Sequence, residues 1–296
     1  MEQFIDLRAL ARVKDLALVA RAVATGFLQG LHESELRGVG IEFSQYRSYE
    51  PGDAPSRIDW KLFARSDRYF VREAERESDI SLWLVLDASD SMALRSEGGV
   101  WSKFEYGRHL VATLAYLAIQ QGDQVGLLLV NGSETQVLPP LGGMRQWYRL
   151  VNVLEQAATS GTVASSAELM RDLVQLRQSG LIVWVTDLYQ YRTEIESAVK
   201  TLVTSRNEVA VLQLENTDEI RFPFQGAVRF EDLETGEQVV ANAAKLRKTY
   251  LAARADWQRA WELALGRSRI SVDRINVDEP LDESLMVYLR RRGKAL

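Results

Sequence analysis

From residue 80 onward, short apolar runs alternate with longer segments whose apolar residues recur at helical spacing. The predicted strands are Ile80–Leu86, Gln124–Asn131, Gln136–Leu138, Gly180–Thr186, Glu208–Leu214 and Ile270–Ile275. The predicted helices are Trp101–Gln121, Met144–Ala157, Ser166–Ser179, Thr193–Leu202, Ala243–Leu265 and Leu281–Arg292. This alternation indicates an α/β fold of the Rossmann-like kind, in which helices flank both faces of a mostly parallel sheet.

Two hairpins are expected to interrupt the parallel pattern. Asn131-Gly132 joins two of the apolar runs and is typical of a tight turn, so an antiparallel pair is predicted at one sheet edge. A second, inserted β-hairpin is predicted near 226–241, with its turn at Glu234–Glu237. It lies outside the α/β alternation and is expected to leave the main sheet.

The first 77 residues differ from the rest and are predicted to form an N-terminal helical and β extension, so the domains are expected at 1–77 and 78–296. A helix is predicted over Leu7–Leu31. The following block, Glu42–Glu77, mixes aromatic, arginine and acidic residues around a turn at Pro51-Gly52-Asp53. Acids nearly match bases there, which argues against nucleic acid; a docking surface and an internal brace remain alternatives.

Composition excludes several classes of function. The net charge of -5 disfavours binding to nucleic acid. The absence of cysteine excludes disulfides and thiol chemistry, and the two histidines are too few for a multi-histidine metal centre. The acidic N-terminus does not resemble a signal peptide, and the apolar stretch Leu16–Leu31 is broken by Arg21. A cytoplasmic protein without a membrane span is expected.

Oxygen-bearing side chains follow the first predicted strand of the sheet. The run Asp87-Ala88-Ser89-Asp90-Ser91 presents a carboxylate and two hydroxyls in one turn, which suits Mg²⁺. The same residues could instead cap a strand-to-helix turn. The loop 158–164 with Thr162, and Asp187 after Gly180–Thr186, are expected at the same sheet edge, which favours the metal over the cap.

The sheet and these three loops resemble a von Willebrand factor A-type domain with a metal-ion-dependent adhesion site. The resemblance implies that Mg²⁺, with Mn²⁺ and Ca²⁺ as alternatives, is held by five residues: Asp87, Ser89, Ser91, Thr162 and Asp187. Thr162 follows Gly161 as the pattern requires, whereas the rival Thr159 has no preceding glycine. The family usually has glycine after the last aspartate, where this chain has Leu188.

A longer pattern resembles a bacterial family of von Willebrand A-like proteins typically encoded beside MoxR-type AAA+ ATPases. It comprises Tyr46-Arg47, Pro51-Gly52-Asp53, Arg57-Ile58-Asp59-Trp60 and Ala64-Arg65, then Phe230–Gly236 and Asp278–Leu281. The resemblance implies an adaptor that works with such an ATPase in the assembly or activation of other protein complexes.

The expected function is therefore metal-dependent protein binding and not catalysis, with an acidic side chain of a client protein as the ligand of the ion. The chain has no Gly-x-x-x-x-Gly-Lys-Ser/Thr phosphate loop, so it is not expected to be an ATPase itself. Two alternatives stay open. One is a metal-dependent hydrolase or nuclease that uses Asp59, Lys61 and Glu73, and the other is an interaction protein whose metal site is vestigial.

Overall fold

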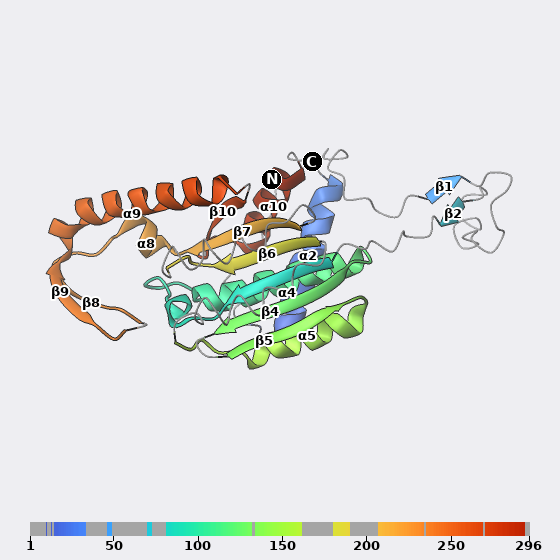
Figure 1. The fold of residues 1–296 in the computed structure, drawn as a ribbon, viewed down its shortest axis with the longest axis horizontal. Coiled ribbons are helices and arrows are strands. Elements are labelled where there is room, and N and C mark those ends of the chain that lie inside the picture. Colours follow the sequence, from blue (N-terminus) through green and yellow to red (C-terminus); the bar gives the residue numbers. More distant parts are fainter. Residues whose placement is uncertain are drawn as a thin grey trace.

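The computed structural model describes residues 10, 13, 15–33, 46–48, 70–72, 81–131, 134–161, 180–189, 207–233, 235–268 and 270–293. Its centre is a six-stranded sheet in the order β10-β7-β6-β3-β4-β5 (Figure 1). The strands are β3 (Ser81–Asp87), β4 (Gln124–Asn131), β5 (Glu134–Leu141), β6 (Gly180–Thr186), β7 (Asn207–Glu215) and β10 (Ser271–Asn276). All neighbours pair in parallel except β4 and β5, so the predicted mostly parallel sheet with an antiparallel edge is confirmed.

Alternate residues of each strand bury their side chains on opposite faces of the sheet. On β3, Leu84 and Leu86 belong to a core beneath the helices α2 (Leu16–Glu33), α4 (Lys103–Gln120), α5 (Met144–Gln156) and α10 (Leu281–Gly293). Trp83 and Val85 face the other core, which is covered by α9 (Ala243–Gly266). Both faces are therefore packed against helices, as the apolar strands predicted.

The helix α2 belongs to the main core, although it lies upstream of residue 78. Its residues Val19, Val23 and Phe27 are buried in the same cluster as Leu110 of α4. The single helix predicted over Leu7–Leu31 is interrupted, because Leu10 is helical but Val13 and Asp15 are not. Asp15 Oδ1 accepts a hydrogen bond from the Leu18 N–H at 2.8 Å and so caps α2 at Leu16, while residues 7–9 lie outside the described part of the chain. The proposed domain boundary near residue 78 stays a prediction.

Several predicted elements differ from the structure in length or were missed. The predicted strand Gln136–Leu138 is too short, because β5 continues through Pro139 and Pro140, which an edge strand tolerates. The short helix α8 (Thr217–Arg221) was not predicted. The inserted hairpin is confirmed as β8 (Ala227–Glu231) paired with β9 (Gln238–Asn242).

The remaining expectations for secondary structure fall largely outside the described residues. The helices predicted over 166–179 and 193–202 lie there, as does most of the aromatic and arginine-rich block. Within that block, β1 (Tyr46–Ser48) pairs antiparallel with β2 (Phe70–Arg72). None of the helices in the described part of the chain combines the length and the hydropathy needed to cross a bilayer.

One of the two histidines, His109, is a core residue of α4. Its ring stacks on Trp101 at 4.2 Å between centroids, and its Nδ1 lies 2.7 Å from the Glu105 carbonyl oxygen. Burial lowers the pKa of His109 from 6.5 to about 4. Protonation of His109 is therefore less favourable in the folded state than in the unfolded state. The free energy of unfolding keeps its full value above the pKa of the unfolded state and decreases as the pH falls towards the pKa of the folded state.

We expect this histidine to make the protein acid-sensitive. Between about pH 7 and about pH 4, wild type should lose about 3 kcal/mol more unfolding free energy than His109→Gln, which carries no titrating group. Urea denaturation of both proteins at the two pH values measures this difference. A parallel decline of the two proteins would contradict the buried neutral imidazole.

Candidate metal centre

The candidate site lies where β3 and β6 end at the carboxyl edge of the sheet. The chain runs from β3 outward to β4 and β5 and later returns to β6 on the other side of β3, so this edge is the switch point where ligands bind in such sheets. Leu86 of β3 is in register with Val185 of β6. The next residues are consequently neighbours, and Thr186 Oγ1 donates a hydrogen bond of 2.7 Å to Asp87 Oδ2.

The loop after β3 folds back so that its polar side chains meet. The Ser89 N–H donates to Asp87 Oδ1 at 2.9 Å, which fixes the second oxygen of this carboxylate. The hydroxyls of Ser89 and Ser91 lie 3.1 Å apart. Asp87 and Ser89 are buried, and a 3-10 helix over Asp90–Ala93 carries Ser91. Three of the five predicted ligands are therefore together.

The second loop is attached to the first by backbone hydrogen bonds. The Ser160 N–H donates to the Ala88 carbonyl at 2.9 Å, and the Asp90 N–H donates to the Gly161 carbonyl at 2.8 Å. In return, the Gly161 N–H donates to Asp90 Oδ2 at 2.8 Å. Thr162 itself lies outside the described residues, so its place in the site stays a prediction, but the residue before it lies against the Asp-x-Ser-x-Ser loop.

The fourth described ligand candidate, Asp187, is already paired with a cation that the sequence did not reveal. Its Oδ2 lies 2.7 Å from Nζ of Lys103, whose side chain is 0% exposed. The same ammonium lies 3.0 Å from Glu219 Oε1. Burial opposes the charge on Lys103, but the two carboxylates prevail and raise its pKa above 10.5. Asp187 and Glu219 thus share one buried cation within the protein.

The residue after Asp187 explains a departure from the family pattern. Leu188 has a φ of 62°, in the left-handed region that favours glycine. Its side chain is buried in the core beneath α9 together with Trp184. Packing of the buried side chain thus holds Leu188 in a backbone conformation that glycine adopts more readily.

The pKa of the buried Asp87 carboxyl is shifted by its surroundings. Burial, followed by repulsion from Asp187, raises the pKa of Asp87 to about 6, although the hydrogen bonds from Thr186 and Ser89 act in the opposite direction. A nearby positive charge would favour its ionised form.

The donor set fits a small hard cation. Neighbouring ligands of an octahedral Mg²⁺ with bonds of about 2.1 Å lie about 3 Å apart, which matches the 3.1 Å between the two serine hydroxyls. In the described part of the chain, no three His, Asp or Glu side chains form a group that could bind a metal. The candidate centre therefore depends on hydroxyl oxygens and on Asp87, while Asp187 is occupied by Lys103.

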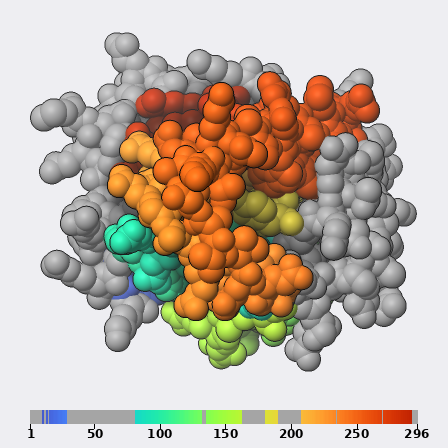
Figure 2. Space-filling model, turned by 90° about the vertical axis from the view of Figure 1, so that its left-hand side faces the viewer, coloured from blue at the N-terminus to red at the C-terminus, as the bar shows by residue number. Residues whose placement is uncertain are grey.

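A cavity of about 600 Å³ adjoins this centre at the same edge. Ser91 and Lys103 line it together with residues of α8, β8 and α9. Figure 2 looks onto the edge and shows the segment around the β8–β9 hairpin, in orange, standing in front of the recessed yellow end of β6. The hairpin thus overhangs the side of the sheet where the candidate ligands lie.

The strand order with its antiparallel edge strand and the Asp-x-Ser-x-Ser loop at the switch point define a von Willebrand A-type α/β protein. The chain belongs to the family described as "Protein of unknown function DUF58", whose model matches residues 45–261. Uncharacterized proteins of Mycobacterium tuberculosis and Mycobacterium bovis are 24% identical to it over 236 residues, which cover 78% of this chain and 73% of each relative.

Comparison with solved structures gives matches at low sequence identity and with TM-scores below 0.5. An aerotolerance-related membrane protein from Bacteroides fragilis is 19% identical, and the conserved hypothetical protein BatB from Bacteroides thetaiotaomicron is 14% identical. Each match has a TM-score of 0.45 and covers 73% of this chain and 100% of the other. A von Willebrand factor type A protein from Catenulispora acidiphila is 11% identical with a TM-score of 0.39, over 72% of this chain and 42% of the other.

Proposed function

We propose that this protein is a non-enzymatic adaptor that binds an acidic side chain of a partner protein through a metal ion. Asp87, Ser89 and Ser91 would hold the ion, with Thr162 as a further ligand. The observation that carries the proposal is the pair of serine hydroxyls 3.1 Å apart beside a buried carboxylate. Mg²⁺ is the ion that this set suits best, and Mn²⁺ and Ca²⁺ are the alternatives.

The charges around the centre favour an acidic ligand. Two of the three described donors are neutral hydroxyls, so Asp87 is the one charged group among these three donors. A divalent cation held by these three donors would leave a net positive charge on the ion and its ligands, which attracts a carboxylate in a site of reduced dielectric constant.

Catalysis receives less support from the described residues. The ring of His109 is engaged with Trp101 and the Glu105 carbonyl within the core. The nuclease alternative rests on Asp59, Lys61 and Glu73, which lie outside the described residues. A vestigial metal site is the remaining alternative, and metal titration distinguishes it.

We further propose that the adaptor works with a MoxR-type AAA+ ATPase in the assembly or activation of other protein complexes. The support is the resemblance of residues 46–65, 230–236 and 278–281 to the family encoded beside such ATPases. Affinity capture from the native cell with and without chelator tests the partnership. Recovery of the ATPase only in the presence of metal is expected, and its absence under both conditions would contradict the proposal.

The metal centre is tested by the double variant Ser89→Ala/Ser91→Ala. Loss of both hydroxyls should weaken Mg²⁺ binding more than about tenfold, which is about 1.4 kcal/mol, and partner binding should fall with it. Calorimetric titration with Mg²⁺, Mn²⁺ and Ca²⁺ measures the first effect, and pull-down measures the second.

Ser160→Ala is the matched control for this variant. Ser160 is exposed in the adjoining loop and contributes its backbone N–H, so loss of its hydroxyl should change neither metal nor partner binding. Partner binding that persists in the double variant after metal binding is lost would show that the metal is not the contact, and would leave the vestigial alternative.

A further inference from the structure

The cavity beside the candidate metal centre has aromatic walls. Phe222 stacks on Tyr250 at 4.5 Å and on Phe230 at 5.6 Å between ring centroids, and Phe224 packs edge-on against Phe222 at 5.2 Å. These rings come from the α8–β8 connection, β8 and α9, and all of them line the cavity. Its volume of about 600 Å³ lies within the range of ligand-binding clefts.

The charged side chains that line the cavity are mostly acidic. Five are carboxylates, namely Glu97, Asp218, Glu219, Glu231 and Asp232, and two are basic, Arg95 and Lys103. Both basic groups are already paired: Arg95 lies 2.6 Å from Glu105, and Lys103 lies between Asp187 and Glu219. Among the residues that the structure describes, no basic side chain forms an ion pair with Glu97, Asp218 or Glu231.

A buried polar group in the cavity wall also lacks a partner. Asn216 is 0% exposed, and its Oδ1 accepts the Glu219 N–H at 2.9 Å as the cap of α8. Its Nδ2 has no hydrogen-bond partner within the described part of the chain.

We infer that this cavity seats an arginine side chain of a partner protein, with its guanidinium group against the aromatic rings and the carboxylates of Glu97, Asp218 and Glu231. A planar guanidinium stacks on aromatic faces and pairs with carboxylates, and it is weakly hydrated, so its transfer from water costs less than that of an ammonium. An acidic occupant would meet repulsion from the five carboxylates that line the cavity.

The inference deepens the proposed function and rests on it for the identity of the partner. Ser91 belongs both to the Asp-x-Ser-x-Ser loop and to the cavity wall. One partner segment could therefore place an acidic side chain at the metal and an arginine in the cavity. The partner segment would therefore carry an acidic residue and an arginine close together. A metal site that recognised only an acidic residue would not require the arginine.

The cavity can be tested without the metal. The full-length chain, labelled with 4-fluorophenylalanine at its nine phenylalanines, is titrated in chelator with acetyl-arginine methylamide. Fluorine resonances of Phe222, Phe224 and Phe230, assigned with Phe→Tyr variants, should shift saturably. The citrulline analogue has nearly the same shape without the charge and should bind at least about tenfold more weakly.

Variants and further probes make the outcome decisive. Glu97→Gln/Glu231→Gln should weaken arginine binding several-fold and leave citrulline binding unchanged. The control Glu237→Gln changes an exposed side chain of the hairpin that is not among those lining the cavity, and it should change neither. Equal binding of arginine and citrulline, tighter binding of the norleucine analogue, or tighter binding of the glutamate analogue would each overturn the inference. If the arginine probe binds but Ser89→Ala/Ser91→Ala still takes up metal and partner, the proposed metal contact fails and the cavity stands.

Discussion

Replacement of Lys103 by methionine should destabilise the folded protein by about 3–5 kcal/mol, because it leaves two buried carboxylates without their cation. The ammonium lies 2.7 Å from Asp187 and 3.0 Å from Glu219, and the lysine side chain is 0% exposed. Methionine preserves most of the buried volume, so the loss reports the charge rather than a cavity. Urea denaturation without divalent metal measures the effect.

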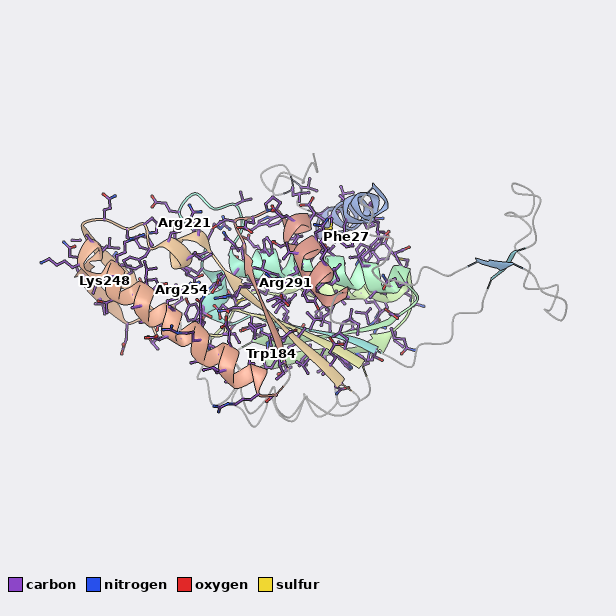
Figure 3. The ribbon with its side chains drawn as sticks, turned by 90° about the horizontal axis from the view of Figure 1, so that it is seen from above. Phe27, Trp184, Arg221, Lys248, Arg254 and Arg291 are labelled. Atoms are coloured by element: carbon purple, nitrogen blue, oxygen red, sulfur yellow. The ribbon has the colours of Figure 1, made fainter. Side chains whose placement is uncertain are left out.

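Two further variants serve as controls for Lys103→Met. The triple variant Lys103→Met/Asp187→Asn/Glu219→Gln removes all three charges and should recover part of the lost stability. Lys248→Met on the exposed side of α9 should change stability by no more than about 0.5 kcal/mol. Figure 3 labels Lys248 near the hairpin end of that helix. A loss of less than about 1 kcal/mol in Lys103→Met would contradict the buried ion triad.

Trp147→Ala should cost about 3–5 kcal/mol, since it removes a large side chain at the centre of one core. Trp147 is 0% exposed, its Nε1 donates to the Ala112 carbonyl at 2.9 Å, and its ring packs edge-on against Tyr116. The guanidinium of Arg21 lies 5.7 Å from the same ring, so the side chain connects α5 with both α4 and α2.

Thermal and urea unfolding should show this loss, and Trp147→Phe should lose less because most of the ring volume remains. Arg149→Ala lies on the exposed face of the same helix and should be nearly neutral. Unfolding of Trp147→Ala at the same urea concentration as Arg149→Ala would contradict the packing of α2 and α4 against α5 through this side chain.

Elements with a strong local pattern were predictable. β6 was predicted at its observed bounds because Leu181–Val185 is an uninterrupted apolar run, and the β4–β5 pair followed from Asn131-Gly132. α8 was missed because five residues are too few to show a helical period. A capping box was nevertheless visible: Asn216 is followed three residues later by Glu219, and the structure uses both as caps.

The candidate site was predictable in its oxygen donors but not in its charge balance. The α/β alternation predicts that the loop with Asp87, Ser89 and Ser91 lies at the carboxyl edge of the sheet, whereas the strand order that makes this the switch point is seen in the structure. Lys103 carried no local signal, because a lysine in the first turn of a helix is ordinarily solvated. Its burial depends on Asp187 and Glu219, which are 84 and 116 residues away in the sequence.

Glu219 has two tasks. Its Oε2 accepts the Asn216 N–H and so starts α8, while its Oε1 binds Lys103. The same carboxylate therefore belongs both to the segment that leads into the β8–β9 hairpin and to the ion triad behind the candidate metal centre. If α8 is pulled outward, Lys103 is left to Asp187 alone, and the electric field at Asp87 changes. The charge of Glu219 thus links the segment that leads into the hairpin to the ion triad. A movement of that segment would change the electrostatic potential at the oxygen cluster.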